Sequence, residues 1–174
     1  MPGEPILAEP SAAAGRVAQV LSARGETLAV AETAAGGLIS RLLLAVPGAS
    51  AWFLGAVVAY SPAARRAWLG LPAEAFGAGG AVSESAAALL AAAARDTLGA
   101  TWGLAETGIA GPQTGRRSRK PAGLAYLAVA GPVSQTREVL TGLDTRVPNQ
   151  EAFAAAAIGL LEEALRRAPH SPSL

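Results

Sequence analysis

The chain has 174 residues, of which 51% are hydrophobic and 16% charged, and its formal net charge is +1. This length suits one globular domain, and the near-neutral charge provides no global field that would attract nucleic acid or an anionic membrane. The absence of cysteine excludes disulfides, thiol catalysis and cysteine-ligated zinc. The single histidine, His170, stands in a Pro- and Ser-containing tail, which excludes Ser-His-Asp catalysis and leaves no histidine placed for a metal.

The N-terminus lacks the basic and apolar regions of a signal peptide, and no apolar run would cross a membrane without meeting Gly, Pro or charge. We therefore expect a cytoplasmic protein that does not contact a membrane. Residues 1–10 are expected to form a flexible leader, residues 11–168 a single domain, and residues 169–174 a tail.

Hydrophobic periodicity and cap residues divide the chain into helices and strands. Ser61 and Ser83 are candidate N-caps, Gly70 and Gly99 are typical of helix ends, and Gly55 could mark a bulge. The predicted elements are helix 11–23, strand 27–31, helix 38–46, strand 51–60, helix 62–70, helix 84–98, strand 101–105, strand 122–130, strand 136–140 and helix 148–167. This alternation predicts a layered α/β domain with a mixed, partly parallel sheet.

Three polar loops follow predicted strands, at residues 32–37, 60–65 and 106–112. If these strands are neighbours in the sheet, the loops line one crevice at the strands' carboxyl ends, where open α/β sheets bind ligands. The alternative is that the glycines serve turns and the polar residues cap helices.

The first of these loops delivers one carboxylate, Glu32, and one hydroxyl, Thr33. It then turns on Gly36 and Gly37 into a helix, whose free N–H groups and positive dipole end would face a ligand. The glycine pair alone is a weak signal, because it matches neither the dinucleotide fingerprint nor a phosphate-binding loop.

Five motifs in order, AETAAGG, PGASAWFLGAVVAYS, GAVSE, TGIAGP and KPAG, resemble the CinA C-terminal domain, the nicotinamide-nucleotide amidohydrolase family. The resemblance covers about residues 12–167. It implies a three-layer α/β/α sandwich that hydrolyses the carboxamide of nicotinamide mononucleotide, giving the nicotinic acid form and ammonia without a cofactor. Together with the Ala-rich helices, it also suggests a homodimer.

Two positions depart from the family pattern. The family's presumed nucleophile is the serine of A-E-S-C-T-G-G, where this chain has Thr33, and its presumed base is the lysine of Y-S-N-E-A-K, where this chain has Arg65. A desolvated lysine can lose its proton, whereas an arginine effectively cannot. The resemblance therefore implies a weakened or altered amidase, and the alternative is a non-catalytic nucleotide-binding or structural module.

Each candidate catalytic residue has more than one interpretation. Thr33 keeps a hydroxyl, but its methyl group restricts χ1 and crowds attack. Arg65 could pair with Glu32, hold a substrate phosphate or carboxylate, or be an exposed helix charge. Glu106 could act as a replacement base, or pair with a nearby arginine, which we consider the better-supported alternative.

The resemblance also suggests residues that bind substrate. Tyr60 would stack on or hydrogen-bond the nucleotide, and the TGIAGP loop would cradle an anionic group with the backbone of Thr107, Gly108 and Gly111. Arg146 matches the first of two family arginines near the last helix. Gln150 falls near the second, so one phosphate contact would be missing.

The segment from Arg116 to Lys120 is basic. Because it has no interleaved aromatic residues, a solvated loop is favoured over a nucleic-acid groove. Lys120 stands in the family's K-P-x-G motif, where a structural role is an alternative.

Overall fold

The computed structural model describes residues 8–113 and 119–169. Arg116, Arg117 and His170, to which the sequence drew attention, lie outside these ranges. The elements are α1 Ala8–Arg24, β1 Leu28–Glu32, α2 Leu38–Leu44, the 3-10 helix η1 Ala49–Ala51, β2 Phe53–Val58, α3 Pro62–Leu69, the 3-10 helix η2 Ala73–Phe76, α4 Glu84–Leu98, β3 Trp102–Gly108, β4 Leu124–Ala130, β5 Gln135–Leu140 and α5 Arg146–Arg167.

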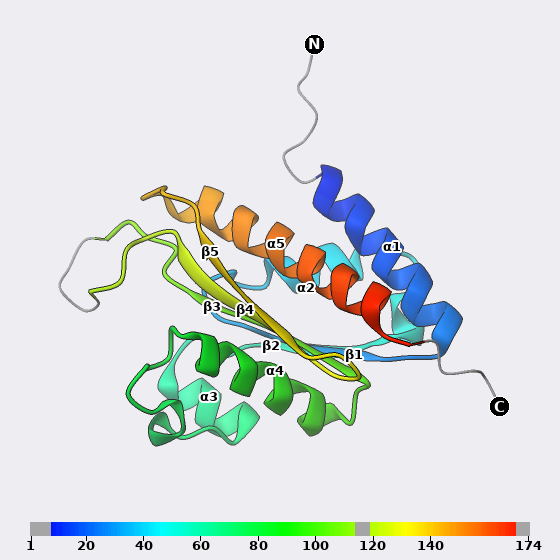
Figure 1. Cartoon of the computed structure of the whole chain (residues 1–174), viewed down its shortest axis with the longest axis horizontal. Helices are drawn as coiled ribbons and strands as arrows, with labels where there is room; N and C mark the ends of the chain where they lie inside the picture. Colours follow the sequence, from blue (N-terminus) through cyan, green and yellow to red (C-terminus); the bar gives the residue numbers. More distant parts are fainter. Residues whose placement is uncertain (1–7, 114–118, 170–174) are drawn as a thin grey trace, which may run out of the picture.

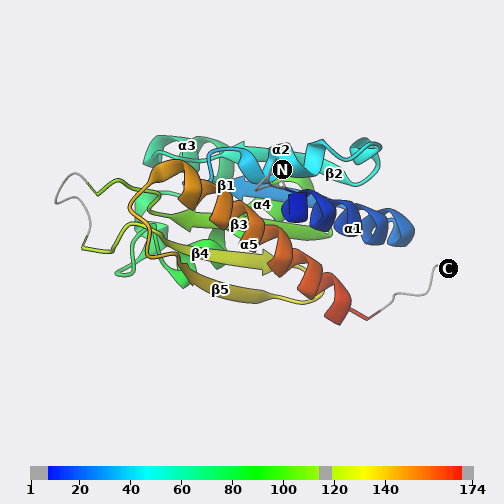
Figure 2. The same cartoon turned by 90° about the horizontal axis from the view of Figure 1, so that it is seen from above.

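The five strands form one mixed sheet in the order β2-β1-β3-β4-β5. β1 pairs in parallel with both β2 and β3, whereas β4 pairs antiparallel with β3 and with β5. Helices α1, α2 and α5 cover one face of the sheet, and α3 and α4 cover the other (Figure 1). Figure 2 looks onto the face that carries α5. The predicted three-layer α/β/α sandwich with a partly parallel sheet is confirmed.

The alternation of side chains along the strands builds a separate core on each face of the sheet. Leu28 and Val30 of β1 face the core under α1, α2 and α5, and Ala29 and Ala31 face the core under α4. The α4 core contains many alanines, which allow this helix to lie close to the strands. Glu32 continues the first series, so its side chain lies on the α2 side of the sheet.

The predicted caps of the central helices are confirmed. The Ser61 and Ser83 hydroxyls accept hydrogen bonds from the backbone N–H groups of Ala64 and Ala86. Gly70 and Gly99 end these helices in the left-handed conformation, which glycine adopts without a steric penalty. The predicted bulge is also present, since the register of β2 against β1 shifts between Phe53 and Gly55.

The predicted starts of the first and last helices were wrong by two or three residues. α1 begins at Ala8 rather than Ser11, and α5 begins at Arg146 rather than Pro148. In both helices a proline, Pro10 or Pro148, is the third residue, a first-turn position where the missing N–H costs no hydrogen bond. Pro148 therefore marked the first turn of α5 without marking its first residue.

Candidate functional site

The three polar loops do lie at one edge of the sheet, because β2, β1 and β3 are parallel neighbours. The predicted crevice at their carboxyl ends therefore has the required topology. One boundary differs: Glu106 and Thr107 are strand residues, opposite Leu127 and Tyr126 of β4, rather than the start of a loop. An antiparallel partner far along the chain extends β3 beyond its predicted end at 105.

Glu32 is fully buried, and its carboxylate caps the start of α2. Oε2 accepts hydrogen bonds from the backbone N–H groups of Gly37 (2.8 Å) and Ile39 (3.2 Å). Oε1 accepts one from the Ser40 N–H (2.8 Å) and another from the Ser40 hydroxyl. The expectation that these N–H groups face a ligand was wrong, because the protein supplies its own anion.

Glu106 is the second fully buried carboxyl group beside this loop. Its Oε2 accepts hydrogen bonds from the backbone N–H groups of Thr33 (3.1 Å) and Ala35 (2.8 Å). Its Oε1 has no hydrogen-bond partner among the described residues. Burial raises the pKa of Glu106 from 4.5 to about 7; the Thr33 and Ala35 amides oppose this shift, and the charge of Glu32 adds to it.

The expectation that Glu106 pairs with an arginine was wrong for the described part of the chain, where its hydrogen-bond partners are backbone amides. Glu32 of β1 and Glu106 of β3 thus bind the segment at residues 33–40 from two adjacent strands. Together their carboxylates bind five backbone N–H groups of this segment. The backbone at Thr33 is therefore fixed by buried acceptors.

Thr33 is 7% exposed and lies between these two anchors. Its backbone N–H is bound by Glu106, but its hydroxyl makes no hydrogen bond to any of the described residues. A nucleophilic hydroxyl needs a base within hydrogen-bond reach, about 2.6–3.2 Å. In the described structure Thr33 is placed without such a base.

Arg65 is buried at 9% exposure, so its interpretation as an exposed helix charge was wrong. Its guanidinium donates hydrogen bonds to the carbonyl oxygens of Tyr60 (3.2 Å) and Ser61 (3.3 Å), and lies 5.3 Å from the ring centroid of Phe76. The pairing with Glu32 is not formed. Burial lowers the pKa of Arg65, but a guanidinium stays protonated at neutral pH even so.

A hollow of about 360 Å³ borders the glycine turn on its α5 side, and its lining includes Gly36, Gly37, Arg41, Val147 and Gln150. The Gln150 side-chain amide donates to the Ala34 carbonyl oxygen at 2.9 Å. A Cβ on Gly36 would lie 3.1 Å from that amide nitrogen, and the φ angle of Gly36 is +68°. Glycine is therefore required here by backbone conformation and by close approach of α5.

Two of the predicted binding residues are exposed at this end of the sheet. Tyr60, after β2, is 62% exposed, and its carbonyl oxygen is held by Arg65. Arg146 is the exposed first residue of α5 and precedes Val147, which lines the hollow. Both side chains are open to solvent and available to a ligand.

The TGIAGP residues have internal contacts in this structure. The Thr107 hydroxyl donates to the Ala81 carbonyl oxygen (2.6 Å). A Cβ on Gly108 would lie 2.8 Å from the Leu124 carbonyl oxygen, and one on Gly111 would lie 3.0 Å from Asp144. These three residues therefore determine how β3 and the loop after it pack. This agrees with the alternative interpretation, in which the glycines of this loop serve turns.

Two further anchors complete this end of the molecule. Asn149, which was not among the predicted site residues, is fully buried, and its amide donates to the carbonyl oxygens of Ala110 (2.9 Å) and Leu143 (3.0 Å). The Lys120 ammonium donates to the carbonyl oxygens of Gly79 (3.1 Å) and Val82. The polar residue Asn149 in the first turn of an otherwise apolar helix face was the available signal.

Over residues 8–113 and 119–169, no three His, Cys, Asp or Glu side chains gather closely enough to hold a metal ion. None of the helices in the same ranges combines the length and hydrophobicity needed to cross a bilayer.

Comparison with known proteins agrees with this architecture. Residues 11–165 match the family model of the CinA C-terminal domain. A CinA-like protein of Anaeromyxobacter sp. (strain K) is 49% identical over 148 residues, which are 84% of this chain and 36% of that protein. A CinA-like protein of Synechococcus elongatus is 43% identical over 116 residues, 67% of this chain and 27% of that protein. The chain thus spans about a third of the length of these curated relatives or less.

Solved structures show the same fold. The competence/damage inducible protein CihA from Agrobacterium tumefaciens superposes with a TM-score of 0.84 at 31% identity, covering 91% of this chain and 96% of that one. A CinA superfamily protein from Klebsiella pneumoniae gives a TM-score of 0.83 at 28% identity, covering 90% and 98%. The family model matches most of the chain, and the solved structures share its fold. Both findings agree with the family resemblance of the five sequence motifs. The chain belongs to the CinA C-terminal domain family.

Proposed function

We propose that this domain binds a nucleotide resembling nicotinamide mononucleotide at the carboxyl ends of β1, β2 and β3, and that it hydrolyses the carboxamide weakly or not at all. The observation that carries this proposal is the environment of Thr33. Its hydroxyl meets no base among the described residues, and Arg65, at the position of the family's lysine, is bound to backbone carbonyl oxygens.

The binding half of the proposal rests on the residues at the rim of the glycine turn. Arg41 lines the hollow beside Gly36 and Gly37, and Arg146 stands next to its lining residue Val147. Two guanidinium groups suit a phosphate, which accepts their hydrogen bonds in a bidentate geometry. Tyr60, largely exposed, provides a ring on which a base can stack.

Glu32 has a different place in this proposal from the one expected. Its two oxygens are already occupied by four donors, and no part of the residue is exposed. We therefore assign it the task of shaping the loop, with Thr33, Tyr60 and Arg146 left for contact with substrate.

The catalytic half depends on proton transfer. In amide hydrolysis by a hydroxyl nucleophile, the oxygen attacks the carboxamide carbon and its proton passes to a base. The base returns that proton to the departing nitrogen, so that the C–N bond breaks and ammonia leaves, and water then cleaves the ester. A protonated guanidinium cannot take that proton. Glu106 is the one described group beside Thr33 whose chemistry could, since it titrates near neutrality and one of its oxygens is unpartnered.

The direct test uses the purified protein and nicotinamide mononucleotide. Ammonia release measures hydrolysis, and titration calorimetry measures binding. We expect saturable binding with little ammonia. Turnover at the rate of an ordinary family amidase would contradict the catalytic half, and absence of binding would contradict the whole proposal and favour a structural module.

Restoring the family's residues gives a second experiment. We expect the double variant Thr33→Ser with Arg65→Lys to release ammonia faster than the natural chain. The variant regains the family's serine nucleophile and a lysine, which can lose its own proton and then accept the proton of the serine hydroxyl. The matched control combines Thr33→Ser with Arg66→Lys, in which the exposed neighbouring arginine is changed instead. Equal rates in the two variants would show that the lost activity lies elsewhere in the site.

A further inference from the structure

Strand β2 is an edge of the sheet, and its surroundings are unusually apolar. Nine large hydrophobic side chains are exposed in the described part of the chain, and six belong to β2, to the residues after it, or to the neighbouring helices. The six are Leu44 (57%), Leu54 (44%), Val58 (39%), Tyr60 (62%), Trp68 (57%) and Leu98 (46%). We call this set the β2-edge patch.

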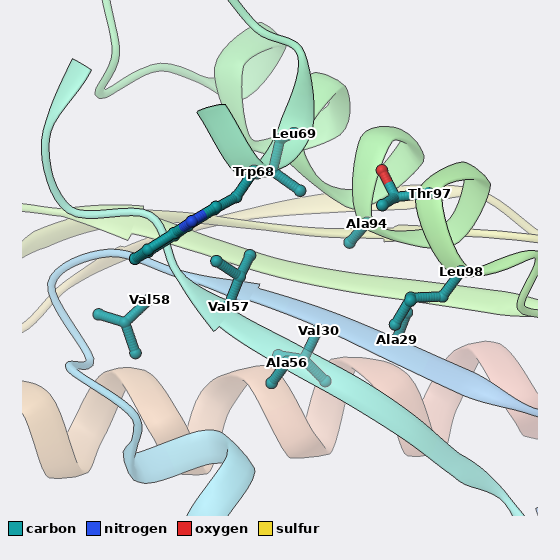
Figure 3. A pocket seen from close by; sticks show the side chains of 10 residues that line it. All are labelled: Ala29, Val30, Ala56, Val57, Val58, Trp68, Leu69, Ala94, Thr97 and Leu98. Atoms are coloured by element: carbon teal, nitrogen blue, oxygen red, sulfur yellow. The ribbon is translucent and has the colours of Figure 1, made fainter. Parts of the chain in front are cut away.

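The patch is hollowed on both sides of the strand. On the α3 and α4 side, a groove of about 500 Å³ is lined mainly by apolar side chains (Figure 3). The Trp68 indole lies at one end of this groove, near Val57 and Val58, and Leu98 lies at the other end, near Ala29 (Figure 3). On the α2 side, a second hollow of about 550 Å³ reaches from Phe53 to Gly37.

No charged residue interrupts this edge. Residues 51–60 contain none. The opposite edge of the sheet, β5, carries Arg137 and Glu138, and Arg137 donates to the Glu163 carboxylate at 2.7 Å. Charges on an edge strand prevent pairing with another chain, and natural proteins use them for that purpose. β5 has this protection, whereas the only such device on β2 is the bulge at its start.

We propose that the β2-edge patch, apart from Tyr60, which lies beyond the end of the strand, is the interface of a two-fold homodimer, in which β2 of one copy lies antiparallel to β2 of the other. In a two-fold interface, residues near the axis meet their own copies, so an uncharged edge is self-complementary and a charged one repels itself. The regular segment after the bulge, 55–58, supplies backbone groups for pairing. Leu54 and Trp68 then pack against the apolar grooves of the partner copy.

The assigned surface lies beside the candidate site. The second hollow is lined by both Val58 and Gly37. A partner copy on β2 therefore covers the surface next to the glycine turn. A homodimer was already suggested by the family resemblance; the surface that forms it is the new assignment. It does not depend on whether the domain binds a nucleotide or hydrolyses one.

Cysteine cross-linking tests the axis directly, because the natural chain has no cysteine. We would introduce one cysteine at a time at Leu54, Ala56 and Val58, which are exposed on β2, and at Leu140, which is 59% exposed on β5. A disulfide requires Cα atoms within about 7 Å, so only residues at the axis link to their own copy. We expect oxidation to give covalent dimers with Ala56→Cys most efficiently, and none with Leu140→Cys. No covalent dimer at any β2 position would overturn the proposal.

A second measurement uses sedimentation equilibrium of the full chain. We expect the natural protein to be dimeric and Leu54→Lys to weaken the dimer about a hundredfold or more, because each copy buries an unpaired charge. The matched control Leu140→Lys should leave the dissociation constant of the dimer unchanged. Melting temperatures confirm that both variants fold. A monomeric natural protein, or equal effects of the two lysines, would contradict the assignment.

Discussion

At the scale of single residues, two buried carboxyl groups define the candidate site. Glu32 and Glu106 come from adjacent parallel strands, and both accept hydrogen bonds from backbone N–H groups of one loop. These hydrogen bonds offset much of the free energy that is needed to remove the two carboxylates from water. Glu106 Oε1, however, accepts no hydrogen bond from the described residues. Glu106 is therefore the residue whose charge is least well compensated.

The stability of the protein should depend on the protonation of Glu106. Its pKa is raised from 4.5 to about 7 in the folded state, so between these pH values the folded protein binds more protons than the unfolded chain. The free energy of unfolding should then fall as pH rises through this interval, by up to about 3 kcal/mol, and level off above it. Urea unfolding of the natural protein and of Glu106→Gln, measured from pH 5 to pH 8, checks this.

In Glu106→Gln this part of the pH dependence should disappear, because the amide does not titrate. Glu74→Gln, which changes an exposed carboxyl group, serves as the control and should keep it. Identical pH profiles for the Glu106 variant and the natural protein would show that Glu106 does not titrate in this range.

At the scale of elements, local signals placed the central helices well and the site loop poorly. Ser61, Ser83, Gly70 and Gly99 act within their own helices, so their roles could be predicted from neighbouring residues. The start of α2 has no Ser or Asp cap; its N-cap residue is Gly37, and the capping anion comes from the preceding strand. A helix cap supplied by Glu32, five residues before the N-cap residue Gly37, does not match the usual pattern of a Ser, Thr, Asp or Asn directly before the helix.

Replacing Glu32 by glutamine should weaken the start of α2. One of the carboxylate oxygens becomes an NH₂ group that faces N–H donors, so at least one donor pair is lost and buried polar groups are left unsatisfied. We expect the free energy of unfolding to fall by about 3 kcal/mol. Denaturant unfolding measures this, with Glu151→Gln on the rim of the nearby hollow as the control. A Glu32 variant as stable as the control would show that the cap contributes little.

At the scale of the whole molecule, the sheet order places the site and a small residue sets the layer spacing. β1 lies between β2 and β3, so three loops distant in sequence meet at one edge. α4 approaches β3 so closely at Gly103 that a Cβ there would lie 2.0 Å from the Ala91 carbonyl oxygen. The packing of α4 against β3, the strand that carries Glu106, therefore depends on the absence of a side chain at Gly103.

Gly103→Ala should be strongly destabilising for this reason. The methyl group would meet backbone rather than a movable side chain, so α4 must shift from the sheet, at a cost of about 3 kcal/mol or more. Gly159→Ala in α5 is the matched control: no atom lies within 4 Å of its Cβ position, and alanine favours helix, so stability should hold or rise. Thermal unfolding of the two variants distinguishes these outcomes, and equal melting temperatures would contradict the expected clash.

The fold class, nearly every helix and strand, and the family could be predicted from the residues alone, because periodicity, caps and short motifs are local properties of the chain. The sequence also predicted that Glu32, Thr33 and Arg65 come to one edge of a sheet. The groups that these residues contact could not be predicted in this way and became known from the folded structure. Glu32 binds the start of α2, Glu106 binds the Thr33 loop, and Arg65 binds the carbonyl oxygens of the chain just before it. Hydrogen bonds between side chains and backbone distant in sequence depend on strand order and register, which no local pattern encodes.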